Sequence, residues 1–368
     1  MSKKNLRKEQ ILSLLGDQPG LSATQVALSL AVSRVTAYSL LQTLRTEQLV
    51  RILGQGKATR YFLQNSSWVR GGASAFTPSD FQNLKAEIIF ALEQKYDEVE
   101  SEEMIERVFM NYCMYITPDN SIVTGFEAFI LWCTDPRHAF GDRIVEKAVE
   151  YLDITSRIEF LRNKNGFIDG AAAARANLSG YMEVGFDRFY FCMPSVLEGG
   201  FGRTRPAQEL YYGKLNGNAH LIAQAIEPWS DAIRSYLQTQ SVDACIFTPP
   251  TQGRNVQFRD ILEQILELKL RVIQAEKVPS LGRILIPQKV ILDKSERIKN
   301  ALDSIQVTIP DGLSTHKHIV IFDDSFTTGA TPNAIALKLR EADYTAEISI
   351  ITLCGSRDYD LAISEDEI

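Results

Sequence analysis

Two adjacent carboxylates and a loop of small polar residues lie close together near the C-terminal end of the sequence. Four consecutive apolar residues, Ile319–Phe322, predict a buried strand, and Asp323 and Asp324 follow it directly. The loop Thr327–Thr331 comes next, and we expect Pro332 at the first position of a helix. Backbone N–H groups and hydroxyls at the start of a helix can bind one phosphate group.

The carboxylates need a different partner, because they would repel a phosphate. Asp323 and Asp324 suit hydroxyl donors, or a magnesium ion shared with a substrate. Both acids are expected at the C-terminal end of a strand, which is where open α/β sheets bind ligands. A ribose 5-phosphate satisfies these requirements, with its phosphate in the loop and its 2′- and 3′-hydroxyls on the acids.

This stretch closely resembles the PRPP-binding signature of type I phosphoribosyltransferases, in which a hydrophobic run, two acids and two further residues precede Thr-Thr-Gly-Ala-Thr. Phe326 departs from it, since a smaller aliphatic residue is usual at that position. The resemblance implies that Asp323 and Asp324 hold the ribose, and Mg²⁺ through the substrate, so that Mg²⁺ with PRPP is the expected cofactor. It assigns the 5′-phosphate to Thr327, Thr328, Gly329, Ala330 and Thr331.

The preceding sequence supplies the other elements of such a fold. Strands are predicted at 243–248 and 271–274, a helix at 257–268, and a further strand at 346–353. In phosphoribosyltransferases a loop after the first of these strands binds pyrophosphate, which assigns that role to Gly253 and Arg254.

Within this superfamily the chain most resembles ComF-like proteins of DNA competence. The matching segments are Tyr212–Lys214 with Leu221–Ile222, the stretch 253–257, and Pro287–Gln288 with Glu296–Arg297 and Asn300. The second match is degraded, and the four-cysteine zinc element of many ComF proteins is absent from the sequence. The resemblance implies that residues 281–300 form a flexible loop that closes over the site.

The charge of the chain is unevenly distributed. Residues 1–65 carry nine Lys or Arg and three Asp or Glu, a balance of +6, within a chain of net charge −7. The remaining residues therefore carry a balance of −13. A basic head on an acidic body indicates separate roles, and the head is the candidate for nucleic-acid binding.

Three helices are predicted in the head, at residues 4–15, 22–30 and 33–44, with Ser22 and Ser33 as N-caps. Strands at 49–53 and 58–63 follow. This order resembles a winged helix–turn–helix domain, whose second paired helix enters the major groove and whose hairpin contacts phosphates. The nucleic-acid candidates are Arg34, Thr36, Tyr38, Arg51, Lys57 and Arg60. A winged helix can also be a protein-interaction module, and the sequence leaves both alternatives open.

The middle of the chain carries no recognisable motif. A helix is predicted to begin at Thr77-Pro78 and to run to about Tyr96. Helical patterns follow at 104–112 and 143–152, and strand-like runs at 126–133 and 189–193. The glycine-rich stretch 198–206, with two arginines, is interpreted as a turn, and a phosphate contact is the alternative.

We therefore expect an α/β protein in five parts. These are a winged helix–turn–helix domain (1–64), a linker (65–76), an unassigned α/β middle (77–205), a phosphoribosyltransferase-like domain with a Rossmann-like parallel sheet (206–357) and an acidic tail (358–368). The linker is rich in Ser and Gly, so the head is expected to move relative to the body.

The composition, 45% hydrophobic and 23% charged, is typical of globular proteins and excludes a disordered chain. The sequence contains no run of about 18 apolar residues, so no membrane span is predicted. The basic N-terminus lacks the apolar segment of a signal peptide. Five dispersed cysteines without metal-ligand spacing indicate reduced thiols. We expect a cytoplasmic protein.

Three functions fit this sequence. The first is a phosphoribosyltransferase that uses Mg²⁺ and PRPP, and this is the function that we favour. The second is a regulator that senses PRPP or a nucleotide without turnover, because purine-operon repressors combine a winged helix with such a fold in the same order. The third is a nucleic-acid-processing or defence effector. The expected partners are PRPP or a nucleotide, DNA or RNA through the head, and a second copy or a larger complex.

Overall fold

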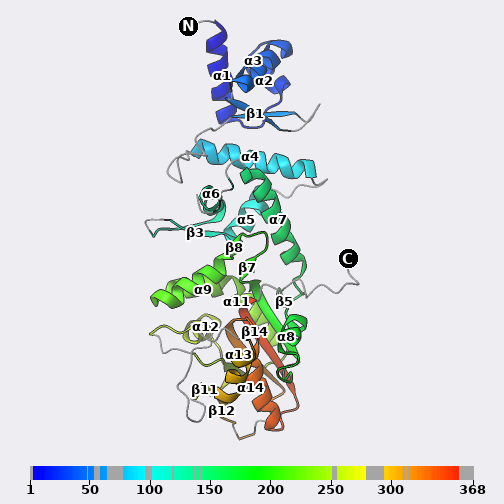
Figure 1. Ribbon diagram of the computed structural model, residues 1–368, viewed down its shortest axis with the longest axis vertical. Helices are drawn as coiled ribbons and strands as arrows, with labels where there is room; N and C mark the ends of the chain where they lie inside the picture. The colour runs from blue at the N-terminus through cyan, green and yellow to red at the C-terminus, as the bar shows by residue number, and fades with distance from the viewer. Residues whose placement is uncertain are drawn as a thin grey trace. The chain divides into compact units, whose positions relative to one another are not determined.

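The computed structural model divides by its internal contacts into two compact units, Met1–Thr155 and Ser156–Ile368 (Figure 1). The residues that it describes are 3–47, 49–53, 59–63, 78–95, 102–117, 120–135, 138, 140, 143–250, 255–278, 294–309, 311–312 and 315–355. The expected linker and acidic tail lie outside these ranges.

Three helices and a hairpin begin the first unit. They are α1 (Lys3–Asp17), α2 (Ala23–Ser29), α3 (Arg34–Thr46) and the antiparallel strands β1 (Val50–Leu53) and β2 (Arg60–Leu63). Both predicted N-caps are confirmed: Ser22 Oγ accepts from the Gln25 N–H at 3.3 Å, and Ser33 Oγ from the Thr36 N–H at 3.1 Å. These bonds satisfy N–H groups that have no partner within the helix and so fix where α2 and α3 begin.

The core of these elements is formed by one apolar face of each of α1 and α3, together with residues of α2 and the hairpin. Ile11 and Leu15 of α1 are fully buried. The buried residues of α3 recur at the spacing of one helix face, namely Ala37, Leu40, Leu41 and Leu44. The opposite face of α3 is left for solvent or a partner.

The rest of the first unit is mainly helical. Its elements are α4 (Pro78–Lys95), α5 (Glu102–Tyr112), the hairpin β3 (Met114–Ile116) and β4 (Ile122–Thr124), α6 (Gly125–Thr134) and α7 (Ile144–Phe160), in which the division between the units falls. The predicted strand at 126–133 is wrong, because these residues belong to α6. Three consecutive residues, Phe129, Ile130 and Leu131, are buried, so α6 is covered on several sides. A short apolar run fits such a helix as well as a buried strand.

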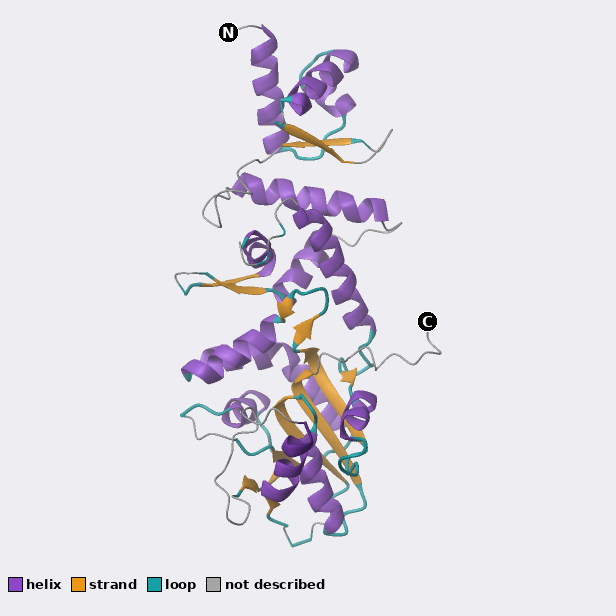
Figure 2. Ribbon diagram, viewed as in Figure 1, coloured by secondary structure: helices purple, strands orange, loops and turns teal. Residues whose placement is uncertain are grey.

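A six-stranded sheet forms the centre of the second unit (Figure 2). Its order is β10 (Arg271–Ile273), β9 (Ala244–Phe247), β13 (His318–Ser325), β14 (Glu347–Gly355), β6 (Arg188–Pro194) and β5 (Ile168–Asp169). Neighbouring strands are parallel except β5, which is antiparallel to β6. The protein is therefore mixed α/β with a mostly parallel sheet.

Helices cover both faces of this sheet. One core joins α8 (Ala171–Leu178), α13 (Lys294–Ser304) and α14 (Ala330–Glu341) to side chains such as Ile321 and Ile350. The other core joins side chains such as Phe322 and Ile351 to a second group of helices. These are α9 (Arg205–Asn216), α10 (Ala219–Ile226), α11 (Ser230–Thr239) and α12 (Phe258–Leu266). Two-sided burial explains why the central strands are almost continuously apolar.

The sheet includes strands that lie before the expected domain boundary at residue 206. Strand β6 pairs with β14 over six residue pairs, from Arg188 with Ser349 to Pro194 with Gly355. The sequence predicts the strand at 189–193, but it does not reveal the partner, because β14 lies more than 150 residues further along the chain. Strands β5 and β6, which precede residue 206, therefore belong to the same sheet as β13 and β14.

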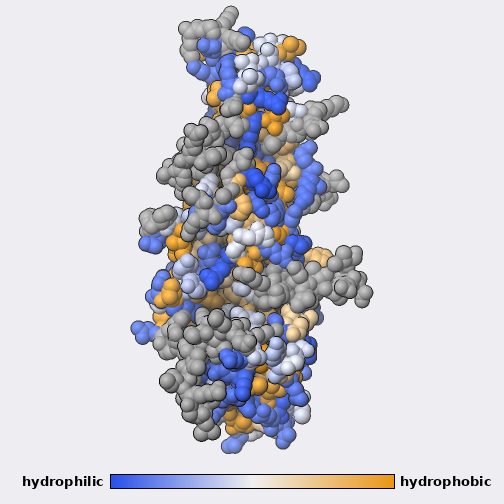
Figure 3. Space-filling model, viewed as in Figure 1, coloured by the Kyte–Doolittle hydropathy of each residue, from blue (hydrophilic) through white to orange (hydrophobic). Residues whose placement is uncertain are grey.

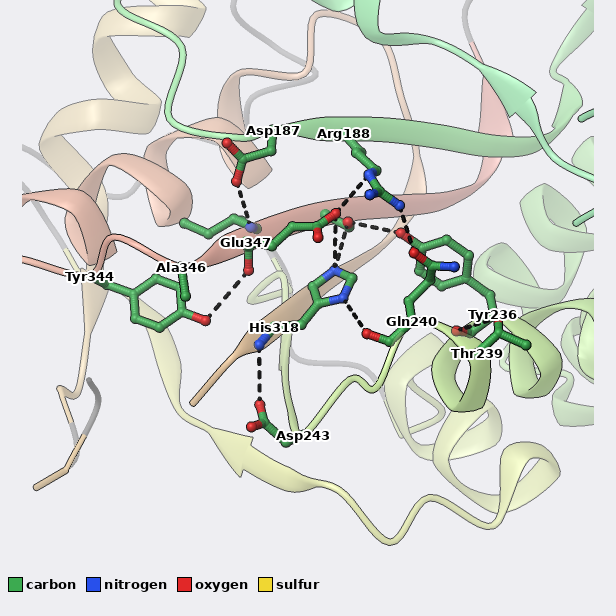
Figure 4. Close-up of polar contacts among 12 residues, drawn as sticks. Asp187, Arg188, Tyr236, Thr239, Gln240, Asp243, His318, Tyr344, Ala346 and Glu347 are labelled. Atoms are coloured by element: carbon green, nitrogen blue, oxygen red, sulfur yellow. Dashed lines mark hydrogen bonds and ion pairs between the residues drawn. The ribbon is translucent and has the colours of Figure 1, made fainter. Parts of the chain in front are cut away.

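A buried polar network surrounds His318 at the N-terminal end of β13 (Figure 4). His318 is buried, with Nδ1 3.1 Å from the Gln240 carbonyl oxygen and Nε2 2.8 Å from Ser349 Oγ, which also lies 2.9 Å from the Tyr236 hydroxyl. Arg188 Nε pairs with Glu347 at 2.6 Å, and its Nη1 donates to Gln240 Oε1 at 2.8 Å. The network joins the first residues of β13, β14 and β6 to the end of α11, so the central strands are held in register at this end.

None of the described helices is both long enough and apolar enough to cross a membrane. On the face drawn in Figure 3, hydrophobic residues lie in small groups among hydrophilic ones. The five cysteines are free and buried.

Candidate functional site

The two predicted carboxylates lie at the C-terminal end of β13, in the middle of the sheet. Ile319 to Phe322 are buried between the two helical layers, and β9 and β14 run parallel on either side. Asp323 and Asp324, the next two residues of the strand, are half-buried. Their carboxylates are therefore at the edge where the parallel strands end, as predicted.

Thr248, the residue after β9, contacts the first acid directly. Its Oγ1 donates to Asp323 Oδ1 at 2.6 Å, and the Asp324 N–H donates to the same oxygen at 2.9 Å. The Thr248 N–H donates to the Phe322 carbonyl at 2.9 Å, which continues the β9–β13 pairing by one residue. Asp323 Oδ1 is thus fixed by two donors.

The second acid has different partners. Asp324 pairs with the ammonium group of Lys214 from α9, and its Oδ1 accepts the Ser325 hydroxyl at 2.8 Å. The Lys214 and Asp324 side chains are 18% and 24% exposed, so solvent weakens this pair less than one on the open surface. The sequence by itself does not indicate that Thr248 and Lys214 contact the acids.

Of the two acids, Asp323 has a strongly raised pKa. Desolvation, and after it the charge of neighbouring Asp324, raise the pKa of the Asp323 carboxyl from 3.8 to about 7. The Thr248 hydroxyl, the Asp324 N–H and Lys214 act in the opposite direction by stabilising the ionised form. Asp323 can therefore exchange a proton near neutral pH, which is a common property of groups in binding and catalytic sites.

The predicted loop leads from the acids into α14. Gly329 is the N-cap with φ +74°, a left-handed conformation that favours glycine. Within the described part of the chain, no acceptor takes the N–H groups of Thr327, Thr328 and Gly329. Thr327 is exposed and Ala330 is buried, so Ala330 offers the site only its backbone. Its N–H donates to Thr328 Oγ1 at 3.3 Å.

The helix begins two residues earlier than predicted. Pro332 is the third residue of α14 rather than the first. Proline fits there because the N–H groups of the first helical turn have no acceptor within the helix. The remaining predicted phosphate ligand, Thr331, is half-buried in that first turn.

Phe326, the departure from the signature, is a core residue. It is 2% exposed, and its ring centroid lies 4.7 Å from that of Phe189 on β6. A Cβ added at Gly329 would lie 3.3 Å from Phe326 and 3.4 Å from Phe189. The large aromatic residue therefore supports the loop from below, and Gly329 is needed for space as well as for conformation.

Helix α14 is fixed by a segment that the sequence does not single out. Asn333 is fully buried, its Nδ2 donates to the Glu183 carbonyl at 2.7 Å, and its Oδ1 accepts the Gly185 N–H at 2.9 Å. A Cβ on Gly185 would lie 2.7 Å from the Leu337 backbone nitrogen, so this segment and the helix backbone are in close contact. Asparagine is unfavourable inside a helix, and this is the only sequence signal of the contact.

Several predicted ligand residues cannot be placed. Gly253 and Arg254 lie outside the described residues, as do residues 281–293 of the expected flexible loop. The expectation of a flexible loop is wrong for residues 294–300, which belong to α13. Ile298 on that helix is buried in the core, which favours a fixed helix.

The glycine-rich stretch forms a small hairpin of β7 (Val196–Leu197) and β8 (Gly202–Arg203). The Arg203 guanidinium lies 4.4 Å from the ring centroid of Tyr211 on α9. Arg205 Nε pairs at 2.7 Å with Glu209, which is 2% exposed. Both arginines therefore have partners within the protein, in agreement with the interpretation of this stretch as a turn.

The head's predicted contact residues fall into two groups. Arg34 and Tyr38 are exposed on α3, while Thr36 is half-buried and its Oγ1 lies 2.8 Å from Ser33 Oγ. Arg51 of β1 pairs with Glu87 of α4, which is fully buried. The Arg60 guanidinium of β2 lies 5.8 Å from the Phe90 ring centroid, again on α4. Lys57 lies outside the described residues.

Among the described residues, no group of three His, Cys, Asp or Glu side chains could hold a metal ion. The acid pair would supply two hard oxygen ligands, which fits Mg²⁺ bound through one or two carboxylates together with substrate oxygens and water. In comparisons with known proteins, no family model matches this chain, and no curated protein matches it.

Proposed function

We propose that the second unit is a phosphoribosyltransferase-like domain that binds the ribose 5-phosphate part of PRPP or of a nucleotide. The observation that carries the proposal is the order of groups at the end of β13. Two carboxylates there are followed, after Ser325 and Phe326, by three N–H groups that have no acceptor among the described residues, just before α14.

The loop and the acids suit the two ends of such a ligand. A phosphate at Thr327–Gly329 would receive N–H bonds at the positive end of a twelve-residue helix. Ribose hydroxyls would donate to the acid pair, where an ionised carboxylate accepts and cannot donate. Mg²⁺ would be held by the substrate together with Asp323 or Asp324, and when bound it would neutralise charge on the pyrophosphate.

The enzyme is the function we propose first. In a transfer reaction, the bond from the ribose C1 atom to pyrophosphate breaks and a bond from C1 to a nucleophilic nitrogen of an acceptor forms. The fixed carboxylates beside the ribose favour positive charge as it develops at C1. The residues described assign no general base for the acceptor.

We propose that the first 64 residues are a winged helix–turn–helix domain that binds DNA or RNA. The helix order, the two N-caps and the balance of +6 over residues 1–65 support this assignment. Exposed Arg34 and Tyr38 on α3 are the best placed contacts. A PRPP-sensing regulator would use the same two sites without turnover, and an effector in a larger complex would use the head for docking.

Calorimetry with Mg-PRPP and with ribose 5-phosphate tests the ligand site. We expect wild-type binding, and loss of binding in the double variant Asp323→Asn with Asp324→Asn. Asp260→Asn is the matched control, because Asp260 is exposed on α12. Unchanged PRPP affinity in the double variant would refute the site.

Two further assays separate the functions. Release of pyrophosphate from Mg-PRPP in the presence of a panel of bases supports the enzyme, and binding without release supports the sensor. A gel-shift assay on the gene's own upstream DNA, with and without PRPP, tests regulation. A head without affinity for DNA or RNA at any salt concentration would be an interaction module instead.

A further inference from the structure

The two acids at the end of β13 differ in which oxygen atoms remain available. Asp323 uses only Oδ1, which accepts from Thr248 and from the Asp324 N–H. No described residue donates to Asp323 Oδ2. On Asp324, Ser325 occupies Oδ1 and Lys214 occupies Oδ2. Only the first acid therefore presents a free carboxylate oxygen in the described structure.

Lys214 has more hydrogen-bond donors than partners among the described residues. An ammonium group has three N–H donors, and among the described residues Asp324 is its one partner. The side chain is 18% exposed, so its position is restricted while access remains. The two remaining donors lie beside the acid pair, where an oxygen-rich anionic ligand would be bound under the proposed function.

The position of Lys214 is built into α9. Gly213, the residue before it, contacts α10 so closely that an added Cβ would lie 2.7 Å from Ile222 Cγ1. At the start of the helix, the buried Thr204 hydroxyl donates to the Pro194 carbonyl at 2.8 Å, at the end of β6. These contacts hold α9 against the edge of the sheet, so Lys214 reaches Asp324 from a fixed helix and not from a surface loop.

We propose that the two acids have different roles: Asp323 accepts a ribose hydroxyl, whereas Asp324 positions Lys214, whose ammonium group donates to oxygen atoms of the bound sugar phosphate. This division of roles rests on the proposed function and refines it. Asp324 is then a positioning residue, and Lys214 is a ligand-binding residue that the acid-and-loop signature does not contain.

A double-mutant cycle measured by calorimetry with Mg-PRPP and with ribose 5-phosphate tests this proposal. The variants are Asp324→Asn, Lys214→Met and the two combined. Each single change should weaken binding roughly 10- to 100-fold, the effect of losing one hydrogen bond to a charged group. The combined variant should bind as weakly as either single one, because Asp324 acts through Lys214.

Three further variants sharpen the test. Asp323→Asn should weaken binding on its own, and the combination with Lys214→Met should be additive. Lys214→Arg retains the positive charge and should recover most of the affinity. Lys269→Met is the matched control, since this exposed lysine precedes β10 at the opposite end of the sheet. Thermal unfolding of each variant checks that it is folded.

The outcomes distinguish this proposal from the proposed function. If wild-type protein binds neither ligand, both fail. If wild-type protein binds but Lys214→Met has no effect while both Asn variants weaken binding equally, Asp324 contacts the ligand itself and only the division of roles fails. Additive losses for Asp324→Asn and Lys214→Met would also overturn it.

Discussion

Thr248 donates its hydroxyl to Asp323 across the pair of strands β9 and β13, at 2.6 Å. The two residues are 75 positions apart, and both stand directly at the carboxyl ends of neighbouring strands. Parallel pairing therefore creates this contact. The Thr248 hydroxyl stabilises the ionised form of Asp323. The bond opposes, without reversing, the desolvation that raises the pKa of Asp323 to about 7.

Asp323 should make the protein less stable as the pH rises. Its pKa is about 7 in the folded protein and close to 3.8 when unfolded, so the folded state binds the proton more tightly. The free energy of unfolding therefore falls between about pH 4 and pH 7, and the penalty is complete above pH 7. Asp323→Asn retains an oxygen acceptor for Thr248 and removes the charge. We expect it to raise the unfolding temperature at pH 8 and to have little effect at pH 4.

Thermal unfolding at both pH values checks this expectation, with Asp260→Asn as the exposed control. A stabilisation that is equal at pH 4 and pH 8 would show that the charge of Asp323 is not its source. The same substitution should weaken ligand binding. A residue that reduces stability while supporting binding is typical of functional sites.

Asn333→Ala should destabilise the second unit. The substitution leaves the buried Gly185 N–H without its partner, at a cost of about 1–3 kcal/mol, and it also removes the hydrogen bond to the Glu183 carbonyl. Chemical denaturation measures the loss, and Asn216→Ala at the exposed end of α9 is the control. Because Asn333 fixes the helix that begins at the phosphate loop, we also expect weaker binding of ribose 5-phosphate. A variant as stable as the control would contradict this role of Asn333.

Local sequence patterns predict the helices and strands of this chain better than they predict which strands pair with one another. The serine N-caps, the apolar face of α3, the strand before Asp323 and the loop after it follow from residues within a few positions of one another. The membership of β6 in the sheet does not follow, because its pairing with β14 depends on a distant segment. The strand predicted in place of α6 shows that an apolar run by itself does not determine periodicity.

The candidate site divides in the same way. Asp323, Asp324 and the loop are contiguous in sequence, so their types and spacing are sufficient to identify them. Thr248 and Lys214 reach the acids only through tertiary packing, from β9 and α9. Arg51 shows the reverse case, since a basic residue on a hairpin suggests a phosphate contact, whereas a buried glutamate 36 residues later is its partner.

Ser349→Ala should weaken the end of the sheet opposite the acid pair. The change leaves His318 Nε2 and the Tyr236 hydroxyl without their shared partner, at about 1–3 kcal/mol for each buried group. His318 and Asp323 are separated by five residues of extended strand, about 17 Å. We therefore expect lower stability in denaturation but an unchanged affinity for ribose 5-phosphate in the folded protein. Ser235→Ala, on the exposed side of α11, is the control, and a loss of affinity at full folding would link the network to the site.

Salt dependence can test which arginine of the head contacts nucleic acid. Arg34 has no side-chain partner among the described residues, whereas Arg51 pairs with buried Glu87. We expect Arg34→Ala to weaken binding and to reduce the slope of log K against log[salt] by about 0.9, the value for one lost phosphate contact. Removing Arg51 alone would leave a buried unpaired charge, at a cost of about 3–5 kcal/mol. The suitable comparison is therefore Arg51→Met together with Glu87→Met, which removes both charges.

This double variant should retain the wild-type salt slope, because the pair is internal to the first unit. Fluorescence anisotropy with a labelled duplex over a salt series measures both slopes, and thermal unfolding confirms that the variants are folded. An equal reduction of the slope in Arg34→Ala and in the double variant would mean that nucleic acid separates Arg51 from Glu87 on binding. If the slope is unchanged in Arg34→Ala and in the double variant, neither Arg34 of α3 nor Arg51 of β1 contacts a phosphate.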